Sequence, residues 1–102
     1  MKHVETKSRD EFFEVLAETS RSQSAVMVLD PGRSTGGPDN RHPESDQWLF
    51  VVSGSGTATV EGQQCAIAAG SLVLIEAGEA HEIACESDAP LRTISVYAPP
   101  AY

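Results

Sequence analysis

Residues 37–56 read GPDNRHPESDQWLFVVSGSG. In this stretch a polar loop with a histidine, an amide and several acidic residues runs directly into the apolar segment Trp48–Val52. The segment is followed by Gly54-Ser55-Gly56, and glycine and serine favour turns. We therefore interpret Trp48–Val52 as a β-strand that carries polar groups to the mouth of an apolar core.

Short segments rich in strand-forming residues recur along the chain, separated by turn residues. Their spacing of roughly 8–12 residues is typical of an all-β sandwich or barrel. No helical pattern follows residue 20, so the crossover helices of a parallel sheet are missing and the strands should pair antiparallel. We expect a closed or nearly closed barrel with a loop across residues 36–40. The other expected strands are residues 25–29, 57–61, 65–68, 71–75, 81–85 and 91–97.

Ahead of these strands the sequence favours one short helix. Ser8-Arg9-Asp10-Glu11 has the form of a capping box, in which the first and last side chains satisfy backbone amides at a helix start. Apolar residues between Phe12 and Leu16 follow at helical spacing. We predict a helix over about residues 9–18, which divides the chain into an N-terminal helical segment, residues 1–24, and a barrel domain, residues 25–102.

The composition limits the partners. The chain has 102 residues, enough for one core, and carries 15 Asp and Glu against 7 Lys and Arg, for a net charge of −8. This charge repels phosphate backbones and anionic lipids, so we expect neither nucleic acid nor a membrane as partner. No apolar run approaches the roughly 18 residues of a membrane span, and we expect a cytoplasmic protein.

Cys65 and Cys85 lack metal-site spacing, and we expect both to be reduced and buried.

Four polar side chains are expected to converge at one end of the barrel. Asn40 and His42 share one face of the chain because they are two residues apart, and Gln47 begins the strand that follows. His81 begins a later strand directly after a glycine-containing loop. If the barrel brings these strand openings together, the four side chains form a cage for a small ligand.

The stretch from Gly37 resembles the first sequence motif of the cupin superfamily. Asn40-Arg41-His42 takes the place of the His-X-His of that motif. Gln47 takes the place of its glutamate, and Gly54 that of its closing glycine. The resemblance implies that Asn40, His42 and Gln47 stand at positions that bind a metal ion in relatives.

The stretch from Gly70 resembles the second cupin motif. Gly70, Gly78 and His81 keep the spacing of that motif, while Glu76 replaces its proline and Cys85 its asparagine. The two motifs and the strands between them cover roughly residues 25–98. The resemblance implies a small single-domain cupin, that is, an all-β, antiparallel double-stranded β-helix or jelly-roll barrel.

A metal would be held by Asn40, His42, Gln47 and His81 if these residues act as in relatives. The resemblance implies Fe, Mn, Ni or Zn, but all four side chains are neutral, so no ligand charge would offset a divalent ion. A bulge at the strand entrance would turn Asp46 inward in place of Gln47 and supply a carboxylate. We favour Gln47 because it keeps the motif's spacing to the closing glycine.

Three functions remain open, and with them the question of whether the protein is an enzyme. The first is a metal-dependent oxygenase, isomerase or lyase acting on a small polar molecule, or a metal-free relative of sugar epimerases that uses His42 or His81 as a base. The second is a non-catalytic receptor for a small molecule. The third is a structural homodimer, in which Phe12 and Phe13 cover the seam. We expect a homodimer in any case.

Overall fold

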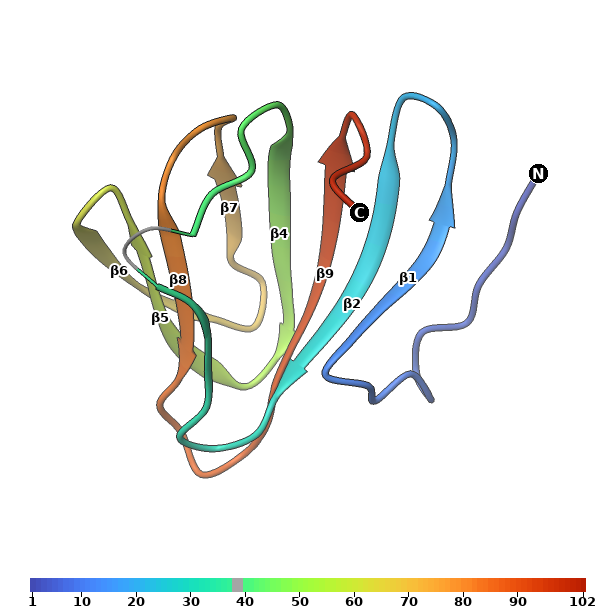
Figure 1. Ribbon diagram of the computed structural model, residues 1–102. Helices are drawn as coiled ribbons and strands as arrows, with labels where there is room; N and C mark the ends of the chain where they lie inside the picture. The colour runs from blue at the N-terminus through green and yellow to red at the C-terminus, as the bar shows by residue number, and fades with distance from the viewer. Residues whose placement is uncertain (38–39) are drawn as a thin grey trace.

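The computed structural model describes residues 1–37 and 40–102. In these residues nine strands form two antiparallel sheets. The two sheets face each other, as Figure 1 shows. The all-β jelly-roll expectation is therefore confirmed. Part of the expected loop at residues 36–40, namely Pro38 and Asp39, lies outside the described residues.

The larger sheet has five strands in the order β1-β2-β9-β4-β7. All four pairings within it are antiparallel. The strand bounds, in sheet order, are β1 (Phe13–Glu18), β2 (Gln23–Leu29), β9 (Leu91–Ala98), β4 (Asp46–Ser53) and β7 (Leu72–Ile75).

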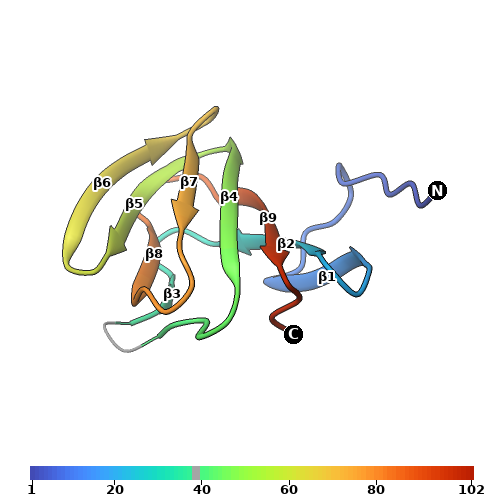
Figure 2. The ribbon, with the colours of Figure 1, turned by 90° about the horizontal axis from the view of Figure 1, so that it is seen from above.

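The smaller sheet has four strands in the order β3-β8-β5-β6, again antiparallel. Its strands are β3 (Ser34–Gly36), β8 (His81–Cys85), β5 (Ser55–Val60) and β6 (Gln63–Ala68). From β2 onward the chain passes between the sheets at every connection except β5–β6. This alternation winds the two sheets into the jelly roll seen from above in Figure 2.

The core lies between the two sheets. Each sheet contributes fully buried aliphatic side chains, among them Leu29 and Leu49 from the larger sheet and Ile67 and Ile83 from the smaller one. The tight crossing from β4 to β5 uses Gly54, whose φ is +87° and whose α-carbon faces the Pro90 carbonyl so closely that a Cβ would collide with it. Glycine at this position therefore lets β4 pass directly from one sheet to the other.

β4 is apolar on both of its faces. Gln47, Leu49 and Val51 point inward and are buried, whereas Trp48, Phe50 and Val52 point outward and are exposed. Pairing with β9 on one side and β7 on the other places Gln47 opposite both Tyr97 and Ile75. The register of this central strand therefore fixes which polar side chain enters the barrel.

The N-terminal helix expected over residues 9–18 is wrong. Phe13–Glu18 is strand β1, which pairs with β2 from Phe13 opposite Met27 to Glu18 opposite Gln23. A β-bulge between Val15 and Ala17 shifts the register, so that apolar residues at helical spacing are accommodated in a strand. Pairing with the exposed edge of β2 supplies backbone hydrogen bonds and outweighs the local helix preference. The division at residues 24/25 stays a prediction, without its helical part.

Two further observations concern the described residues. Cys85 is buried as expected, but Cys65 is exposed on the edge strand β6, so the expectation that both thiols are buried is wrong for Cys65. No helix within residues 1–37 and 40–102 is long and apolar enough to cross a membrane.

Candidate functional site

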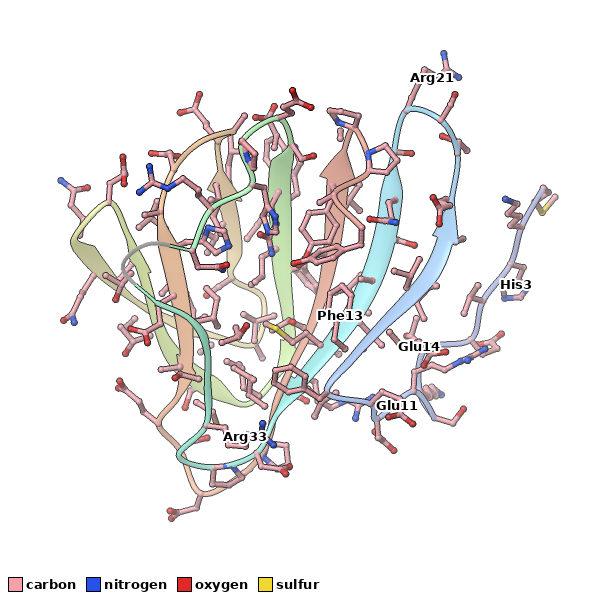
Figure 3. All side chains as sticks on the ribbon, viewed as in Figure 1. His3, Glu11, Phe13, Glu14, Arg21 and Arg33 are labelled. Carbon is pink, nitrogen blue, oxygen red and sulfur yellow. The ribbon has the colours of Figure 1, made fainter. Side chains whose placement is uncertain are left out.

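A pocket of about 260 Å³ lies between the two sheets. It takes side chains from both sheets and from the chain that follows β9; in Figure 3 the ring of Phe13 points into the space between the sheets. Its wall combines aromatic and aliphatic groups with a few polar ones, as is usual for small-molecule sites. The lining residues are Phe12, Phe13, Met27, Thr35, Asn40, Gln47, His81, Ile83, Tyr97 and Tyr102.

Backbone hydrogen bonds join the two strand openings that the sequence analysis brought together. The His81 amide donates to the Asn40 carbonyl at 2.8 Å, and the Gly78 amide donates to the His42 carbonyl at 2.8 Å. Gly36 permits this close approach, because its φ is +80° and a Cβ there would lie 2.6 Å from the His81 carbonyl oxygen. The loop before β4 is thereby fixed against the loop before β8.

His81 presents one ring nitrogen to the pocket. Its Nδ1 lies 3.1 Å from the Glu79 carbonyl oxygen, which can only accept a hydrogen bond, so we assign the proton to Nδ1. Nε2 then carries a lone pair and lies 3.5 Å from Asn40 Nδ2. The imidazole is therefore oriented to accept a hydrogen bond or to bind a metal ion through Nε2.

His42 lies among aromatic rings. Its ring centroid is 5.0 Å from that of His81, 5.1 Å from that of Tyr97 and 5.5 Å from that of Tyr102. Burial, and next the neighbouring His81, hold the pKa of His42 below its ordinary value of 6.5, against a weaker opposite effect from Gln47. His42 is therefore neutral at physiological pH, with a lone pair available.

Gln47 is buried and has one unused oxygen. Its Nε2 donates to Ser95 Oγ at 3.1 Å, whereas its Oε1 has no hydrogen-bond partner among the described residues. Asp46 points away from the barrel and accepts from the Ala77 amide at 2.9 Å. The inward residue is therefore Gln47, as we favoured, and the bulge that would turn Asp46 inward is not formed.

The residues after β9 fold back and place Tyr102 beside the pocket. The buried Gln23 side chain holds them: its Nε2 donates to the Tyr102 carbonyl at 2.8 Å, and its Oε1 accepts from the amides of Ala101 and Tyr102 at 3.2 and 3.0 Å. The Tyr102 ring packs 4.7 Å from Phe13 and 5.3 Å from Tyr97, centroid to centroid. Burial, and next the Tyr102 phenol, raise the pKa of Tyr97 above its ordinary value of 10.0, so this phenol stays protonated.

The structure brings together all four side chains that the sequence analysis selected, Asn40, His42, Gln47 and His81. Tyr97, Tyr102, Ser95 and Gln23 were not predicted from the sequence. In β9 the buried positions are Leu91, Thr93, Ser95 and Tyr97, while the apolar Ile94 and Val96 face outward. Tyr97 lies opposite Gln47 in the pairing of β9 with β4. This pairing is the signal that could have identified Tyr97 as a residue of the site.

The residues at this site do not fit a typical cupin metal centre. The two imidazoles lie close enough to share an ion, but the remaining donors are amides and no carboxylate faces the pocket from the described chain. Within residues 1–37 and 40–102 no three His, Cys, Asp or Glu side chains are grouped to hold a metal. A divalent ion would thus enter without an opposing charge, which is unfavourable in a buried site.

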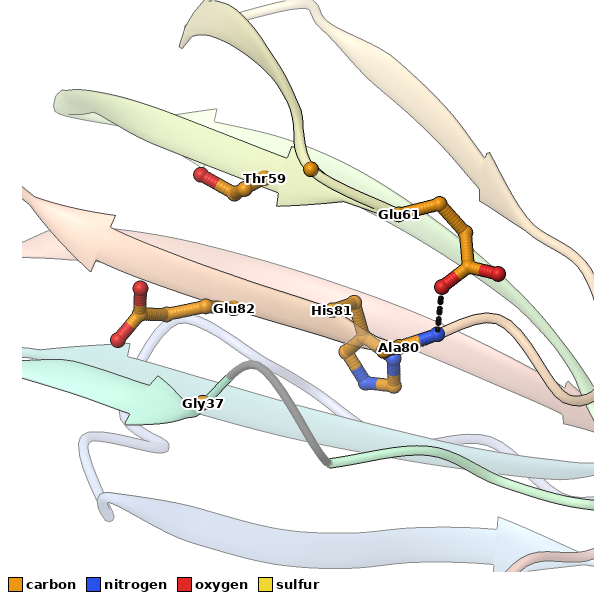
Figure 4. Close-up of a pocket in the computed structure, with 7 residues that line it drawn as sticks. Gly37, Thr59, Glu61, Ala80, His81 and Glu82 are labelled. Carbon is orange, nitrogen blue, oxygen red and sulfur yellow. Dashed lines mark hydrogen bonds between the residues drawn. The ribbon is translucent and has the colours of Figure 1, made fainter.

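A second, shallower pocket of about 420 Å³ lies on the outside of the smaller sheet, as Figure 4 shows. Thr59 and Glu82 are cross-strand partners on its floor, on the face opposite the core. The Glu61 carboxylate accepts from the Ala80 amide at 3.1 Å, so it is occupied in holding the loop before β8. His81 lines both pockets, whereas the amide side chains of Asn40 and Gln47 line the inner pocket alone.

Fold and inner pocket together define a small jelly-roll barrel with an uncharged cage of imidazole and amide groups. The family model described as the cupin domain matches residues 25–97, which is most of the chain. The chain therefore belongs to the cupin family.

Solved structures agree with this assignment. A Bacillus halodurans protein is 28% identical, with a TM-score of 0.88 over 95% of this chain and 76% of that one. A predicted oxalate decarboxylase from Thermotoga maritima is 26% identical, with a TM-score of 0.71 over 76% of this chain and 66% of that one. A Thermus thermophilus protein, 21% identical, shares the fold with a TM-score of 0.84 over 97% of this chain and 98% of that one. A comparison with curated proteins finds no match.

Proposed function

We propose that this cupin binds a small, neutral, hydroxylated molecule in the inner pocket. One observation carries the proposal: Gln47 Oε1 is buried and has no hydrogen-bond partner within residues 1–37 and 40–102. An unpaired buried acceptor costs about 1–3 kcal/mol, and a ligand hydroxyl that donates to it would recover this energy. His81 and Asn40 line the same pocket, and the His42 ring lies 5.0 Å from the His81 ring, centroid to centroid.

The pocket's charge favours a neutral ligand. A carboxylate or phosphate would have to leave water without a cationic side chain among the described lining residues. The same argument disfavours oxalate, which the name of the Thermotoga maritima relative suggests, because it would enter as an anion. The protein's net charge of −8 repels anions as well.

The aromatic side of the pocket favours a ligand with a compact carbon skeleton. Phe13, Tyr97 and Tyr102 offer ring faces and edges opposite the polar groups. A cyclic polyol or a sugar has hydroxyl groups on its rim and apolar C–H groups on its faces, so it matches both sides of this wall. We therefore name sugars and cyclic polyols as the ligand class.

The test is a thermal-shift screen that compares neutral sugars and polyols with carboxylates and sugar phosphates. We expect a neutral sugar or polyol to raise the Tm of the parent protein, and the shift to disappear in His42→Ala and in Gln47→Leu. His3→Ala serves as the matched control because His3 is exposed in the N-terminal segment. A ligand that stabilises His42→Ala and Gln47→Leu as much as the parent, or stabilisation by anions alone, would contradict the proposal.

Metal binding by Asn40, His42, Gln47 and His81 stays a prediction, and the donor set makes it the weaker one. Elemental analysis of protein purified without chelator distinguishes the two functions. We expect far less than one equivalent of Fe, Mn, Ni or Zn. A full equivalent of one of these metals would favour a metal-dependent function over the binding of a neutral ligand that we propose.

Catalysis without a metal is a second candidate, supported by the lowered pKa of His42. A neutral imidazole can remove a proton from a carbon next to a carbonyl group, and the protonated Tyr97 phenol lies beside it. Incorporation of deuterium from heavy water into a bound sugar, lost in His42→Gln, would establish this activity.

A cytoplasmic location also stays a prediction, which cell fractionation would test.

A further inference from the structure

Side chains, and not a backbone ladder, close the barrel between β1 and β3. These two strands are edges of different sheets, and within residues 1–37 and 40–102 no strand pairing joins them. The inner pocket reaches this side, since Phe13 of β1 and Thr35 of β3 line it. The Arg33 guanidinium, 4.9 Å from the Phe12 ring centroid, bridges part of the opening. The side chains here therefore decide what the pocket admits.

The Tyr102 ring closes a further part of this opening. It packs against three other rings, with centroid distances of 4.7 Å to Phe13, 5.3 Å to Tyr97 and 5.5 Å to His42. All three distances lie within the roughly 4.5–7 Å of favourable aromatic pairs. Tyr102 lines the pocket and is nevertheless 61% exposed, so it stands at the mouth of the pocket and not in the core.

Gln23 fixes the position of Tyr102 from below the surface. The side chain of Gln23 is 1% exposed and makes three hydrogen bonds to the backbone of residues 101 and 102. Figure 2 shows the end of the chain between β1 and the loop that leads into β4. The ring is thus held in place by a buried anchor, on a segment that belongs to neither sheet.

Tyr102 takes space that a larger ligand would need. With its ring in place the pocket has a volume of about 260 Å³. Sites for drug-sized ligands span roughly 300–1,000 Å³, so this pocket has room for one small ring beside its polar groups. The place of the Tyr102 ring is bordered by Phe13, Tyr97 and His42, and a second ring of a ligand would meet the same three neighbours.

We propose that Tyr102 limits the ligand of the inner pocket to a single six-membered ring, because its own ring occupies the place of a second one. This inference rests on the proposed function, in which the inner pocket is the ligand site, and makes its ligand class narrower. Among sugars and cyclic polyols, the pocket accepts a monosaccharide or a monocyclic polyol and excludes a disaccharide. Tyr102 is thereby a specificity-determining residue.

Two cyclic alcohols test the size limit apart from the ligand class. Cyclohexanol has one ring and one hydroxyl group, and decahydro-2-naphthol adds a second, fused ring. The second ring adds apolar area, which by itself favours binding. Weaker binding of the larger alcohol therefore reports a steric limit. Because neither probe is a sugar, the limit is measured even if the sugar screen fails, and a failed limit leaves the sugar screen valid.

NMR titration gives the Kd of each probe, and shifts of the His81 and Tyr97 ring protons place it in the inner pocket. We expect the parent to bind cyclohexanol at least about 10-fold more tightly than decahydro-2-naphthol. In Tyr102→Ala this order should be inverted, because the second ring takes the vacated place. Tyr102→Phe is the matched control: it keeps the ring without the hydroxyl group and should keep the preference of the parent.

Gln23→Met provides a second variant, in which the ring is present but its anchor is lost. We expect the preference for cyclohexanol to fall in Gln23→Met as well. A circular dichroism spectrum like that of the parent shows that each variant is folded, as expected for a change at the exposed Tyr102.

Inversion in Tyr102→Ala, with the preference kept in Tyr102→Phe, supports the proposal. Four results would overturn it: a parent that binds decahydro-2-naphthol as tightly as cyclohexanol, an unchanged preference in Tyr102→Ala, a preference lost in Tyr102→Phe, or no shift of the His81 and Tyr97 signals with either probe.

Discussion

At the scale of single residues, position 47 determines the charge of the pocket. Replacing Gln47 with Glu adds the missing carboxylate beside two imidazoles, a donor set suited to divalent transition metals. We expect Gln47→Glu to lose about 1–3 kcal/mol of stability without metal, because the new acid is buried. Zn²⁺ or Ni²⁺ should restore this stability and bind the variant at least about 10-fold more tightly than the parent.

Isothermal titration and urea unfolding measure these two effects. Gln64→Glu is the matched control, since Gln64 is exposed on β6 and gains the same charge away from the pocket. Equal metal affinity in Gln47→Glu and in the parent would contradict our account of the site.

His42 makes stability depend on pH. Its pKa in the folded protein lies below the ordinary 6.5, so the unfolded chain binds the proton more readily. The contribution of His42 is therefore complete above pH 6.5 and is lost as the pH falls from 6.5 to the folded pKa. Urea midpoints measured on both sides of pH 6.5 should fall less on acidification in His42→Gln than in the parent. A variant that loses as much stability as the parent would show that another group is responsible; His3→Gln is the control.

The four polar residues of the site could be predicted because Gln47 and His81 stand at the starts of β4 and β8, and Asn40 and His42 lie in the loop that leads into β4. Tyr97 and Tyr102 could not, for two different reasons. The inward position of Tyr97 depends on the pairing of β9 with β4, a long-range contact that local periodicity does not contain. Tyr102 depends on the turn after β9 and on Gln23, which lies 79 positions away in the chain.

At the scale of elements, β1 shows why local patterns misled the prediction. Its apolar residues suit a helix, but the bulge between Val15 and Ala17 also lets them follow a strand. The free edge of β2 then decides between the two, since it offers backbone hydrogen bonds that a separate helix would leave unused. Strand β3, only Ser34–Gly36, was missed because three residues carry no periodicity.

The connection between β2 and the residues after β9 yields a prediction of its own. Gln23→Met keeps the volume of the side chain but removes all three hydrogen bonds to residues 101 and 102. We expect a loss of about 1–3 kcal/mol and faster amide exchange at these two residues, which hydrogen exchange measures. Gln63→Met, at an exposed position on β6, should change neither. Unchanged protection in Gln23→Met would mean that other contacts hold Tyr102.

At the scale of the whole molecule, the acidic surface should limit stability. With a net charge of −8, the folded chain brings like charges together, and salt reduces their repulsion. We expect the urea midpoint of the protein to rise from low salt to about 1 M NaCl, where the screening length is about 3 Å. A midpoint that falls with NaCl would indicate that attractive ion pairs dominate instead.

The overall architecture was predictable because strand rhythm, turn residues and motif spacing all depend on neighbours in the chain. Seven of the nine strands in the described residues overlap the expected segments. The order of strands across a sheet, and the covering of Val26 and Val28 by the N-terminal segment, depend on long-range packing that local patterns do not report.

The outward orientation of Trp48 has a practical consequence. Both tyrosines of the chain, Tyr97 and Tyr102, surround the inner pocket, whereas its one indole stands on the far side of the sheet. Phenol absorbance should respond to ligand entry, and indole fluorescence to events on the outer surface. An unlabelled sample thus carries two optical signals that are already separated in space.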